Sequence, residues 1–354
     1  MSTPRVSILL PNLNHRRFLE ERLATIQSQT FPDWELIVAD SHSTDGAWEL
    51  LQATARNDPR VHLSQTPQDG PYANWNRCLE QAKGEFVYIA TSDDTMSPDC
   101  IKQLVSALDA HSDCDIAQCC LHAIDEHGTI VPDWWRLIGL ARFLGDDYLR
   151  PHIRRAPYDG ILHAGMHTIY HSITQVLLRK TIFAATGPFP TQYGGGGDFC
   201  WGMKAGFVCN VIHVPAFLAT WRIHAEQVSH TYRETSAERA QMALMVDEAL
   251  SARPISHPSS RLPAAPLRFP YRYEYHRLAY AETPTRVGKL IKLLRFAITE
   301  PFVFLQALRI RRKGGRYSFD KAAYIRELIQ RFHVERCFER LPSPATPPLS
   351  EVRQ

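Results

Sequence analysis

The sequence predicts an α/β protein: a mixed sheet with helices on both faces, followed by a mainly helical C-terminal extension. Through the first half of the chain, short runs of β-branched and apolar residues alternate with amphipathic helical patterns, as in layered α/β folds. The 354 residues exceed the usual size of one hydrophobic core, which favours a large first domain with an appended part. The predicted strands are Val6–Leu10, Trp34–Ala39, Val61–Ser64, Glu85–Ala90, Asp115–His122, Gln175–Arg179, Val208–Val214 and Phe217–Arg222.

Helices are predicted between these strands. The segment Phe18–Gln29 carries one apolar stripe at helical spacing. After the fourth strand, Ser97 is expected to cap a helix that has Pro98 at its first position. The segment Asp125–Tyr170 shows no clean period and is expected to be rich in loops. Other helices are expected from Ser43–Gly46 to about Asn57, over Tyr72–Ala82, and after Asp198.

The chain is expected to divide near residue 225. Residues 1–225 would form the first domain, and residues 226–354 a helical extension with a Pro- and Ser-rich linker at 253–270. Within the extension, residues 286–313 place an apolar helical stripe beside several Lys and Arg residues. This pattern is typical of an interfacial helix on an anionic membrane, and equally of a helix packed on the first domain, so both interpretations stay open.

Composition argues against several classes of protein. Hydrophobic residues make up 44% and charged residues 22%, and the formal net charge is +3, so neither disorder nor nucleic-acid binding is indicated. The eight cysteines lack C-x-x-C pairs and are expected to be reduced thiols in a cytosol. We expect no export signal, because an apolar strand begins after only five residues and no long hydrophobic region precedes it. We expect no transmembrane helix, because Phe296–Ile310 is short and contains Glu300 and Pro301. We expect a cytoplasmic protein that contacts the inner face of the membrane peripherally.

Polar clusters follow three predicted strands, at Pro11–Asn14, Asp40–Ser43 and Thr91–Asp94. Ligands of open α/β sheets bind at the carboxyl ends of strands, so these clusters should converge. Adjacent Asp93 and Asp94 would repel each other without a cation, and Mg²⁺ typically uses one or two carboxylates plus phosphate oxygens. The pair therefore predicts a metal and phosphate site, with helix capping or a solvated turn as the alternative.

Several motifs occur in series over about Val6–His224, and together they resemble the family 2 glycosyltransferases of the GT-A fold. The resemblance implies a Rossmann-like nucleotide-binding domain, a nucleotide-diphosphate-sugar donor, Mg²⁺ or Mn²⁺, and a saccharide or lipid-linked acceptor. The motifs are Val6–Asn14, Gln29–Asp40, Ser43–Gly46 and Ala82–Glu85.

The resemblance also implies donor contacts. Asp40 matches the acid that contacts the nucleotide base, while Ser41 replaces the usual second acid. A turn-forming role is the alternative for Asp40. Pro11 and Asn14, from the first motif, are predicted donor contacts as well.

On the donor-side helix, Asn76 and Arg77 match the usual Asn and basic positions, although Ala73 stands where the family has Asp. Arg77 would then face a phosphate, or would simply be an exposed helix charge.

The metal ligands follow from the same resemblance. Asp94 is expected to bind the metal directly, and Asp93 to contact the ribose or the metal. Thr91 stands where family members often have a further Asp. His224, in an Arg-x-His motif, is expected to approach the metal or the diphosphate.

Asp198 matches the catalytic base of inverting members, with Gly197 in place of the usual Glu. Such a base takes a proton from the acceptor hydroxyl as its oxygen attacks the anomeric carbon. Capping of the following helix is the alternative role.

His163, His167 and His171 recur every four residues, which on a helix would align three imidazoles as a zinc face. Gly165 and the weak helical pattern argue against this site, so acceptor-loop or packing roles are preferred.

The resemblance implies an inverting transferase of cell-surface polysaccharide or glycolipid synthesis. It implies a nonprocessive one, because the Gln-x-x-Arg-Trp element and membrane helices of processive members are not visible. A nucleotidyltransferase is the first alternative, but it usually needs a Gly-rich loop where this chain has Pro11–His15. A sugar-nucleotide-binding protein without transferase activity is the second, suggested by Ser41, Ala73, Thr91 and Gly197.

Overall fold

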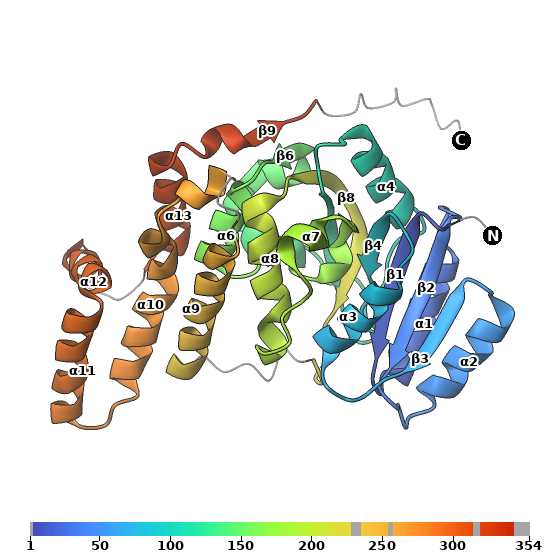
Figure 1. Cartoon of the computed structure of the whole chain (residues 1–354), viewed down its shortest axis with the longest axis horizontal. Coiled ribbons are helices and arrows are strands. Elements are labelled where there is room, and N and C mark those ends of the chain that lie inside the picture. Colours follow the sequence, from blue (N-terminus) through green and yellow to red (C-terminus); the bar gives the residue numbers. More distant parts are fainter. Residues whose placement is uncertain (1–2, 228–234, 254–257, 314–318, 343–354) are drawn as a thin grey trace.

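The computed structural model describes residues 3–227, 235–253, 258–313 and 319–342. Its nine strands form one mixed sheet in the order β3-β2-β1-β4-β7-β5-β8-β6-β9, so the predicted fold class is confirmed (Figure 1). The strands are β1 Val6–Asn12, β2 Trp34–Asp40, β3 Val61–Gln65, β4 Phe86–Ile89, β5 Ile116–Ile124, β6 His152–Arg154, β7 Val176–Arg179, β8 Val211–Arg222 and β9 Phe338–Arg340.

Strand directions bring the ends of distant segments to one edge of the sheet. β1, β2, β3 and β4 pair in parallel. β7 runs antiparallel to both β4 and β5, so β5 has the direction of β4, and β8 is parallel to β5. The carboxyl ends of β1, β4 and β8 therefore share an edge, which is where open α/β sheets bind ligands.

The helices pack around this sheet, and α9 to α13 gather at the end of the molecule away from β3 (Figure 1). The helical extension is thus confirmed as mainly helical. The helices are α1 Arg16–Gln27, α2 Ala47–Asn57, α3 Pro71–Gln81, α4 Cys100–Ala110, α5 Gly139–Leu144, α6 Tyr158–Met166, α7 Ile182–Thr186, α8 Gly197–Val208, α9 Ser236–Ser251, α10 Ala264–Ala281, α11 Arg286–Thr299, α12 Pro301–Lys313 and α13 Lys321–Arg331.

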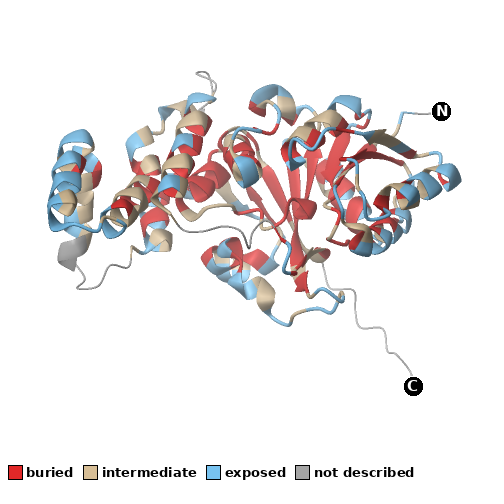
Figure 2. Ribbon diagram, turned by 90° about the horizontal axis from the view of Figure 1, so that it is seen from below, coloured by how far each residue is buried: buried red, intermediate tan, exposed pale blue. Residues whose placement is uncertain are grey.

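The core lies along the central strands (Figure 2). Every residue of β4 is at most 1% exposed, as expected for a strand covered on both faces. Helices α6 and α8 approach so closely that a Cβ on Gly206 would lie 2.5 Å from the backbone nitrogen of Gly160. Only a glycine fits at that crossing.

Two predicted details of the secondary structure were wrong. The two strands expected over residues 208–222 are one strand, β8, whose pairing register with β5 shifts on both sides of Cys120. Helix α4 begins at Cys100 with Asp99 as the preceding residue, so Ser97 does not cap it and Pro98 is outside it. Local capping preferences misplaced this boundary by two residues.

The segment Asp125–Tyr170 is more regular than predicted. It contains α5, β6 and α6, together with 3₁₀ turns at Trp134–Leu137 and Gly145–Leu149. β6 pairs antiparallel with β8. This insertion extends the sheet beyond the strands that the sequence pattern had indicated.

The C-terminal extension returns to the sheet. β9 pairs antiparallel with β6, and the Leu341 amide donates to the Pro151 carbonyl at 2.9 Å. Arg155 bonds Glu339 at 2.8 Å across the same pair of strands. Helix α10 begins at Ala264, inside the Pro- and Ser-rich segment, whose residues 254–257 lie outside the described part of the chain.

None of the helices in the described ranges has the length and apolar character that crossing a membrane requires.

Candidate active site

A cavity of about 700 Å³ opens at the carboxyl edge of the sheet. Its lining comes from the loop after β1, the loop after β4, the start of α3, the start of α8, residues 167–173 and the end of β8. Of the predicted site residues, Pro11, Asp93, Asp94 and Asp198 line it. Two carboxylates from one strand end and a third from a distant helix thus share one space.

Asp94 is held rigidly at the wall of this cavity. Its Oδ2 accepts hydrogen bonds from the hydroxyls of Thr91 and Ser172, each at 2.8 Å, and a longer one from Thr174. Its Oδ1 accepts from the backbone N–H of Arg222 at 2.8 Å. Burial, and secondly the negative charge of Asp93, raises the pKa of Asp94 to about 6. The acidic pair therefore has a structural role that sequence analysis did not assign to it.

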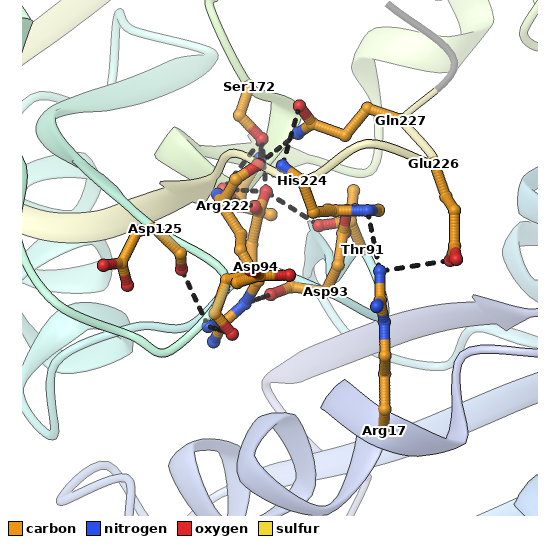
Figure 3. A network of polar contacts seen from close by, with 12 residues as sticks. Arg17, Thr91, Asp93, Asp94, Asp125, Ser172, Arg222, His224, Glu226 and Gln227 are labelled. Carbon is orange, nitrogen blue, oxygen red and sulfur yellow. Dashed lines mark hydrogen bonds and ion pairs between the residues drawn. The ribbon is translucent and has the colours of Figure 1, made fainter. Parts of the chain in front are cut away.

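Arg222 ties the acidic loop to the rest of the fold (Figure 3). Its side chain is buried, with Nε donating to the Asp93 carbonyl at 2.7 Å and one Nη to the Asp125 carbonyl at 3.2 Å. The other Nη pairs with Glu21 at 2.6 Å. The guanidinium thus fixes the backbone under the two aspartates rather than contacting their carboxylates.

Asp93 is the more accessible of the pair. Its Oδ2 lies 3.1 Å from Nε2 of His224, whose Nδ1 lies 3.2 Å from the Arg17 guanidinium (Figure 3). Arg17 pairs in turn with Glu226 at 3.1 Å. Although burial opposes the charged form, the His224 hydrogen bond and the nearby His15 ring together lower the pKa of Asp93. As the pH falls, Asp94 therefore takes up a proton first, and Asp93 keeps its negative charge to a lower pH.

The residues present fit a divalent cation that is shared with a diphosphate. Within the described ranges, no three His, Cys, Asp or Glu side chains are grouped as a complete protein metal site. Asp93 and Asp94 can supply carboxylate oxygens, and Mg²⁺ usually takes its remaining ligands from substrate phosphates and water. Because four donors already occupy the oxygens of Asp94, Asp93 has the greater free acceptor capacity.

Asp198 lies in the first turn of α8, and Gly196 rather than Asp198 is the capping residue. Its Oδ1 lies 2.9 Å from the hydroxyl of Tyr72 and accepts from the Phe199 amide at 2.7 Å. Burial raises the pKa of this carboxyl group. The predicted capping alternative is therefore wrong.

Steric crowding explains why position 197 is a glycine. A Cβ at this position would lie 2.3 Å from the Pro190 carbonyl oxygen and 2.6 Å from the ring of Tyr72. The side chain of Tyr72, which reaches Asp198, fills the space that a Glu would need. Gly197 thus leaves room for the Tyr72 ring beside Asp198.

Asp40 is fully buried and does not line the cavity. Its Oδ2 accepts from Asn12 at 2.8 Å and from the Ser43 hydroxyl at 2.7 Å, while its Oδ1 accepts from the Ser43 amide. These contacts match the turn-forming alternative. The neighbouring Ser41 does line the cavity and accepts from Asn74 at 2.6 Å.

Three other predicted donor residues make contacts within the protein and do not line the cavity. Asn14 accepts from the Thr44 amide at 2.8 Å. Asn76 forms two hydrogen bonds with the backbone of Phe189, at 2.8 and 2.9 Å. Arg77 bonds Asp69 at 2.7 Å, so its charge is already paired. Their contacts shape the loops around the site.

Several buried polar atoms at the cavity have no hydrogen-bond partner among the described residues. They are Asn12 Oδ1, His15 Nδ1, Trp75 Nε1, His167 Nε2 and His171 Nε2. Buried polar groups are normally satisfied by protein, water or ligand. This mixture of donors and acceptors at a concave surface indicates a polar ligand.

The three spaced histidines do not form a shared site. His163 is fully buried in α6, and its ring would contact any side chain at Gly202. His167 stacks on Phe199 at 4.7 Å, and His171 packs edge-on against Trp221 at 4.4 Å. α6 ends at Met166, so helical alignment fails there. The packing interpretation agrees with these contacts, and the acceptor-loop role stays a prediction.

Acidification is expected to destabilise the fold. Burial lowers the pKa of His152 and His163 to about 3, and that of His167 and His171 to about 4. Unfolded histidines bind a proton near pH ~6.5, so below this pH the unfolded state holds more protons than the folded state. The free energy of unfolding should then fall as the pH falls from about 6.5 toward 4, by up to about 1.4 kcal/mol per pH unit for each residue.

Thermal unfolding followed by circular dichroism across this pH range checks the prediction. His163→Phe should flatten the dependence, while replacing exposed His127 by Asn should leave it unchanged. A melting temperature that stays constant or rises on acidification would contradict it.

Tyr72, Asn12 and Arg222 are site residues that sequence analysis did not select. Asn12 falls inside the first motif of the resemblance, Tyr72 lies on the donor-side helix and Arg222 opens the Arg-x-His motif, and these matches are the one signal that could have marked them. Their partners lie far away in sequence, and no local pattern reveals them.

The fold and the site together define a GT-A domain, with an acidic pair after a central strand and a carboxylate from a later helix in the same cavity. Residues 7–170 match the family model described as Glycosyl transferase family 2.

Two curated relatives illustrate the similarity. The chain is 37% identical over 95 residues to the GalNAc(5)-diNAcBac-PP-undecaprenol beta-1,3-glucosyltransferase of Campylobacter jejuni, covering 26% of this chain and 31% of that protein. It is 34% identical over 97 residues to the putative teichuronic acid biosynthesis glycosyltransferase TuaG of Bacillus subtilis, covering 27% and 38%. The alignments thus span about a third of these relatives.

Among solved structures, residues 1–349 of Staphylococcus aureus TarS in complex with UDP-GlcNAc align with a TM-score of 0.62 and 16% identity. The alignment covers 89% of this chain and 94% of that one. At this identity the likeness concerns the fold, and it extends well beyond residue 170 into the helical extension.

Proposed function

We propose that this protein is an inverting, nonprocessive glycosyltransferase that moves a sugar from a nucleotide-diphosphate sugar to an acceptor hydroxyl, in cell-surface polysaccharide or glycolipid synthesis. One observation carries the proposal: the acidic pair Asp93 and Asp94 and the separate carboxylate Asp198 line the same cavity of about 700 Å³. The match of residues 7–170 to the model of family 2 glycosyltransferases supports it.

Asp198 serves as the general base in this proposal. It removes the proton from the acceptor hydroxyl while the oxygen attacks the anomeric carbon, and the bond from that carbon to the nucleotide diphosphate breaks. Attack from the face opposite the leaving group inverts the configuration. Tyr72 positions the carboxylate through its 2.9 Å contact, and the raised pKa of Asp198 makes it a stronger proton acceptor than an exposed Asp.

Asp93 and Asp94, with His224 behind Asp93, would hold Mg²⁺ or Mn²⁺ beside the donor diphosphate. The cation, when bound, neutralises charge on the departing nucleotide diphosphate. Ser172 holds the Asp94 carboxylate and Arg222 holds the Asp93 carbonyl, so the acidic loop is fixed before the donor arrives, which limits the reorganisation needed on binding.

The donor end of the cavity is proposed to lie between Pro11, Asn12 and Ser41, which line it. The free Oδ1 of Asn12 can accept a hydrogen bond from the base or ribose. Asp40 acts through Asn12, whose amide nitrogen it holds at 2.8 Å. Asn14, Asn76 and Arg77 support the loops around this end.

We propose the catalytic domain at residues 1–225 and a C-terminal extension at 226–354, in a cytoplasmic protein. A saccharide or a lipid-linked molecule is the proposed acceptor, and residues 286–313 are the proposed peripheral contact with the membrane. The side chains of residues 311–313, at the end of this segment, lie outside the described part of the chain.

Incubation of the purified chain with UDP-, GDP- and dTDP-sugars, with Mn²⁺ or with EDTA, tests the proposal. Release of nucleoside diphosphate from one donor, dependent on the metal, is expected. If the chain binds a donor but releases no nucleoside diphosphate, whichever acceptor extract is added, it is instead a sugar-nucleotide-binding protein. Pyrophosphate-dependent formation of a nucleoside triphosphate would indicate a nucleotidyltransferase.

A further inference from the structure

The loop of residues 167–173 lies between the two groups of carboxylates in the active-site cavity and contributes to its lining. At one end of the loop, His167 stacks on Phe199 in the first turn of α8, next to the proposed base. At the other end, Ser172 donates to Asp94 at 2.8 Å. In the proposed reaction the acceptor hydroxyl must lie between the base and the donor. This loop therefore borders the space that the acceptor enters.

Two imidazole nitrogens of the loop are available to an acceptor. Nε2 of His167 and Nε2 of His171 are buried and have no hydrogen-bond partner among the described residues, and both residues line the cavity. Burial lowers the pKa of each ring to about 4, so both imidazoles are neutral at physiological pH. A neutral ring nitrogen donates or accepts according to its tautomer, and a hydroxyl group can complement either role.

The backbone of His167 is in an unfavourable conformation. Its φ is 80° and its ψ is −161°, a region that residues other than glycine rarely adopt. A glycine would adopt this conformation with less strain, but it would lack the ring. Strained backbone of this kind is found most often at functional sites, where the surrounding structure holds it in place. The stack on Phe199, with ring centroids 4.7 Å apart, provides such support here.

An aromatic surface lies beside the two histidines. Trp221 is half-buried and lines the cavity, and its ring packs on His171 at 4.4 Å and on Trp134 at 4.9 Å. Phe199 and Met242 also line the cavity. A sugar ring has a face of C–H groups and a rim of hydroxyls, so an aromatic surface with a few polar atoms at its edge suits it.

The charge of the cavity restricts the acceptor further. Four carboxylates line it, those of Asp93, Asp94, Asp198 and Glu226, and none of the described residues in the lining is a Lys or an Arg. A cation would offset the acidic pair, and Arg17 pairs with Glu226 at 3.1 Å. The partners of Asp198 are uncharged, since they are the Tyr72 hydroxyl and the Phe199 amide. An anionic group on the acceptor would therefore be repelled by Asp198.

We propose that the acceptor hydroxyl belongs to an uncharged saccharide residue, whose other hydroxyls bond Nε2 of His167 and of His171 and whose C–H face packs against Trp221. The inference rests on the proposed transferase function and narrows its acceptor. A sugar with a carboxylate or a phosphate close to the reacting hydroxyl fits less well, because Asp198 repels it. The inference concerns the sugar that enters the cavity, whether it is free or linked to a lipid.

Transfer to synthetic glycosides tests the inference. The full chain, with Mn²⁺ and the donor that it hydrolyses, is given the p-nitrophenyl glycosides of glucose, galactose and N-acetylglucosamine. The glucuronide and a phosphorylated glucoside serve as their charged counterparts. We expect transfer to at least one neutral glycoside, with kcat/KM at least about tenfold above that of the charged counterparts, because one uncompensated contact between like charges separates them.

The outcomes separate this inference from the proposed function. Equal or more efficient transfer to a charged counterpart would overturn the inference and leave the transferase function standing. Donor hydrolysis without transfer to any glycoside of the panel would have the same meaning. If no donor releases its nucleotide in a metal-dependent way, the proposed function fails, and the inference fails with it.

Ring-preserving variants test the two histidines. His171→Phe keeps a ring packed against Trp221, and His167→Phe keeps the stack on Phe199, but each removes the Nε2 atom. Each is expected to raise the KM of the best glycoside by about three- to tenfold, the usual contribution of one hydrogen bond, with a smaller change in kcat. Thermal unfolding followed by circular dichroism verifies that the variants are folded.

Two further variants make the result specific. His171→Gln restores a polar atom near the position of Nε2 and should recover most of the lost affinity for the glycoside. The matched control is His127→Phe, at a side chain that is 79% exposed and outside the cavity, and it should keep the wild-type KM. A wild-type KM in both His171→Phe and His167→Phe would overturn the assignment of these histidines to the acceptor.

Discussion

Asp198→Asn is expected to lower kcat by about 10²- to 10⁴-fold, the usual contribution of a positioned general base. The amide keeps the shape of the side chain and can still accept from the Phe199 amide and from Tyr72, but it cannot take the acceptor proton. Donor and metal affinity should stay near the wild-type values, since the acidic loop is untouched. Steady-state kinetics with the active donor, and calorimetry with the corresponding nucleotide diphosphate and Mn²⁺, measure the two quantities.

Two further variants make this test specific. Asp146→Asn removes an exposed carboxylate outside the cavity and should leave kcat unchanged. Tyr72→Phe removes only the hydroxyl and should reduce kcat less than Asp198→Asn while moving the acidic limb of the pH profile, because the hydrogen bond from Tyr72 lowers the pKa of Asp198. Wild-type kcat in Asp198→Asn would eliminate it as the base.

Asp94→Asn is expected to raise the metal concentration for half-maximal activity by roughly 10- to 100-fold, as when a ligand or its support is lost at a metal site. Nucleotide affinity in the presence of Mn²⁺ should fall with it, whereas affinity in EDTA should change little. The amide can still accept from the Arg222 backbone, and the hydroxyls of Thr91 and Ser172 can reorient toward it.

Comparison with Asp93→Asn shows which carboxylate contacts the cation. The free acceptor capacity of Asp93 leads us to expect an effect at least as large as that of Asp94→Asn. Ser172→Ala, which removes one hydrogen bond to Asp94 and no charge, should have a smaller effect. Unchanged metal dependence in both aspartate variants would refute the metal role of this loop.

The strand pattern and the acidic loop were predictable because both depend on local sequence. A buried apolar run before Asp93 and Asp94 indicated a strand end, and the structure has β4 there. Strand direction was not predictable, since period-two patterns look the same in either direction. The sequence therefore did not reveal that β7 runs antiparallel between β4 and β5.

Contacts of the site residues depended on pairs far apart in sequence. Tyr72 meets Asp198, and Arg222 meets the Asp93 carbonyl, across more than a hundred residues in each case. Periodicity and spacing carry no information about such pairs. Asn76 shows that a motif match does not by itself place a residue at the cavity. It matches a donor position of the family, but it forms its hydrogen bonds with the backbone of Phe189.

The return of the chain to the sheet through β9 has a consequence for solubility. A long, flat, unpaired outer strand can recruit strands from other molecules, and proteins counter this with short, charged outer strands. β9 is three residues long, and its exposed Glu339 and Arg340 form ion pairs with Arg155 and Asp147. It covers β6 and ends the sheet with a strand too short and too highly charged to template aggregation.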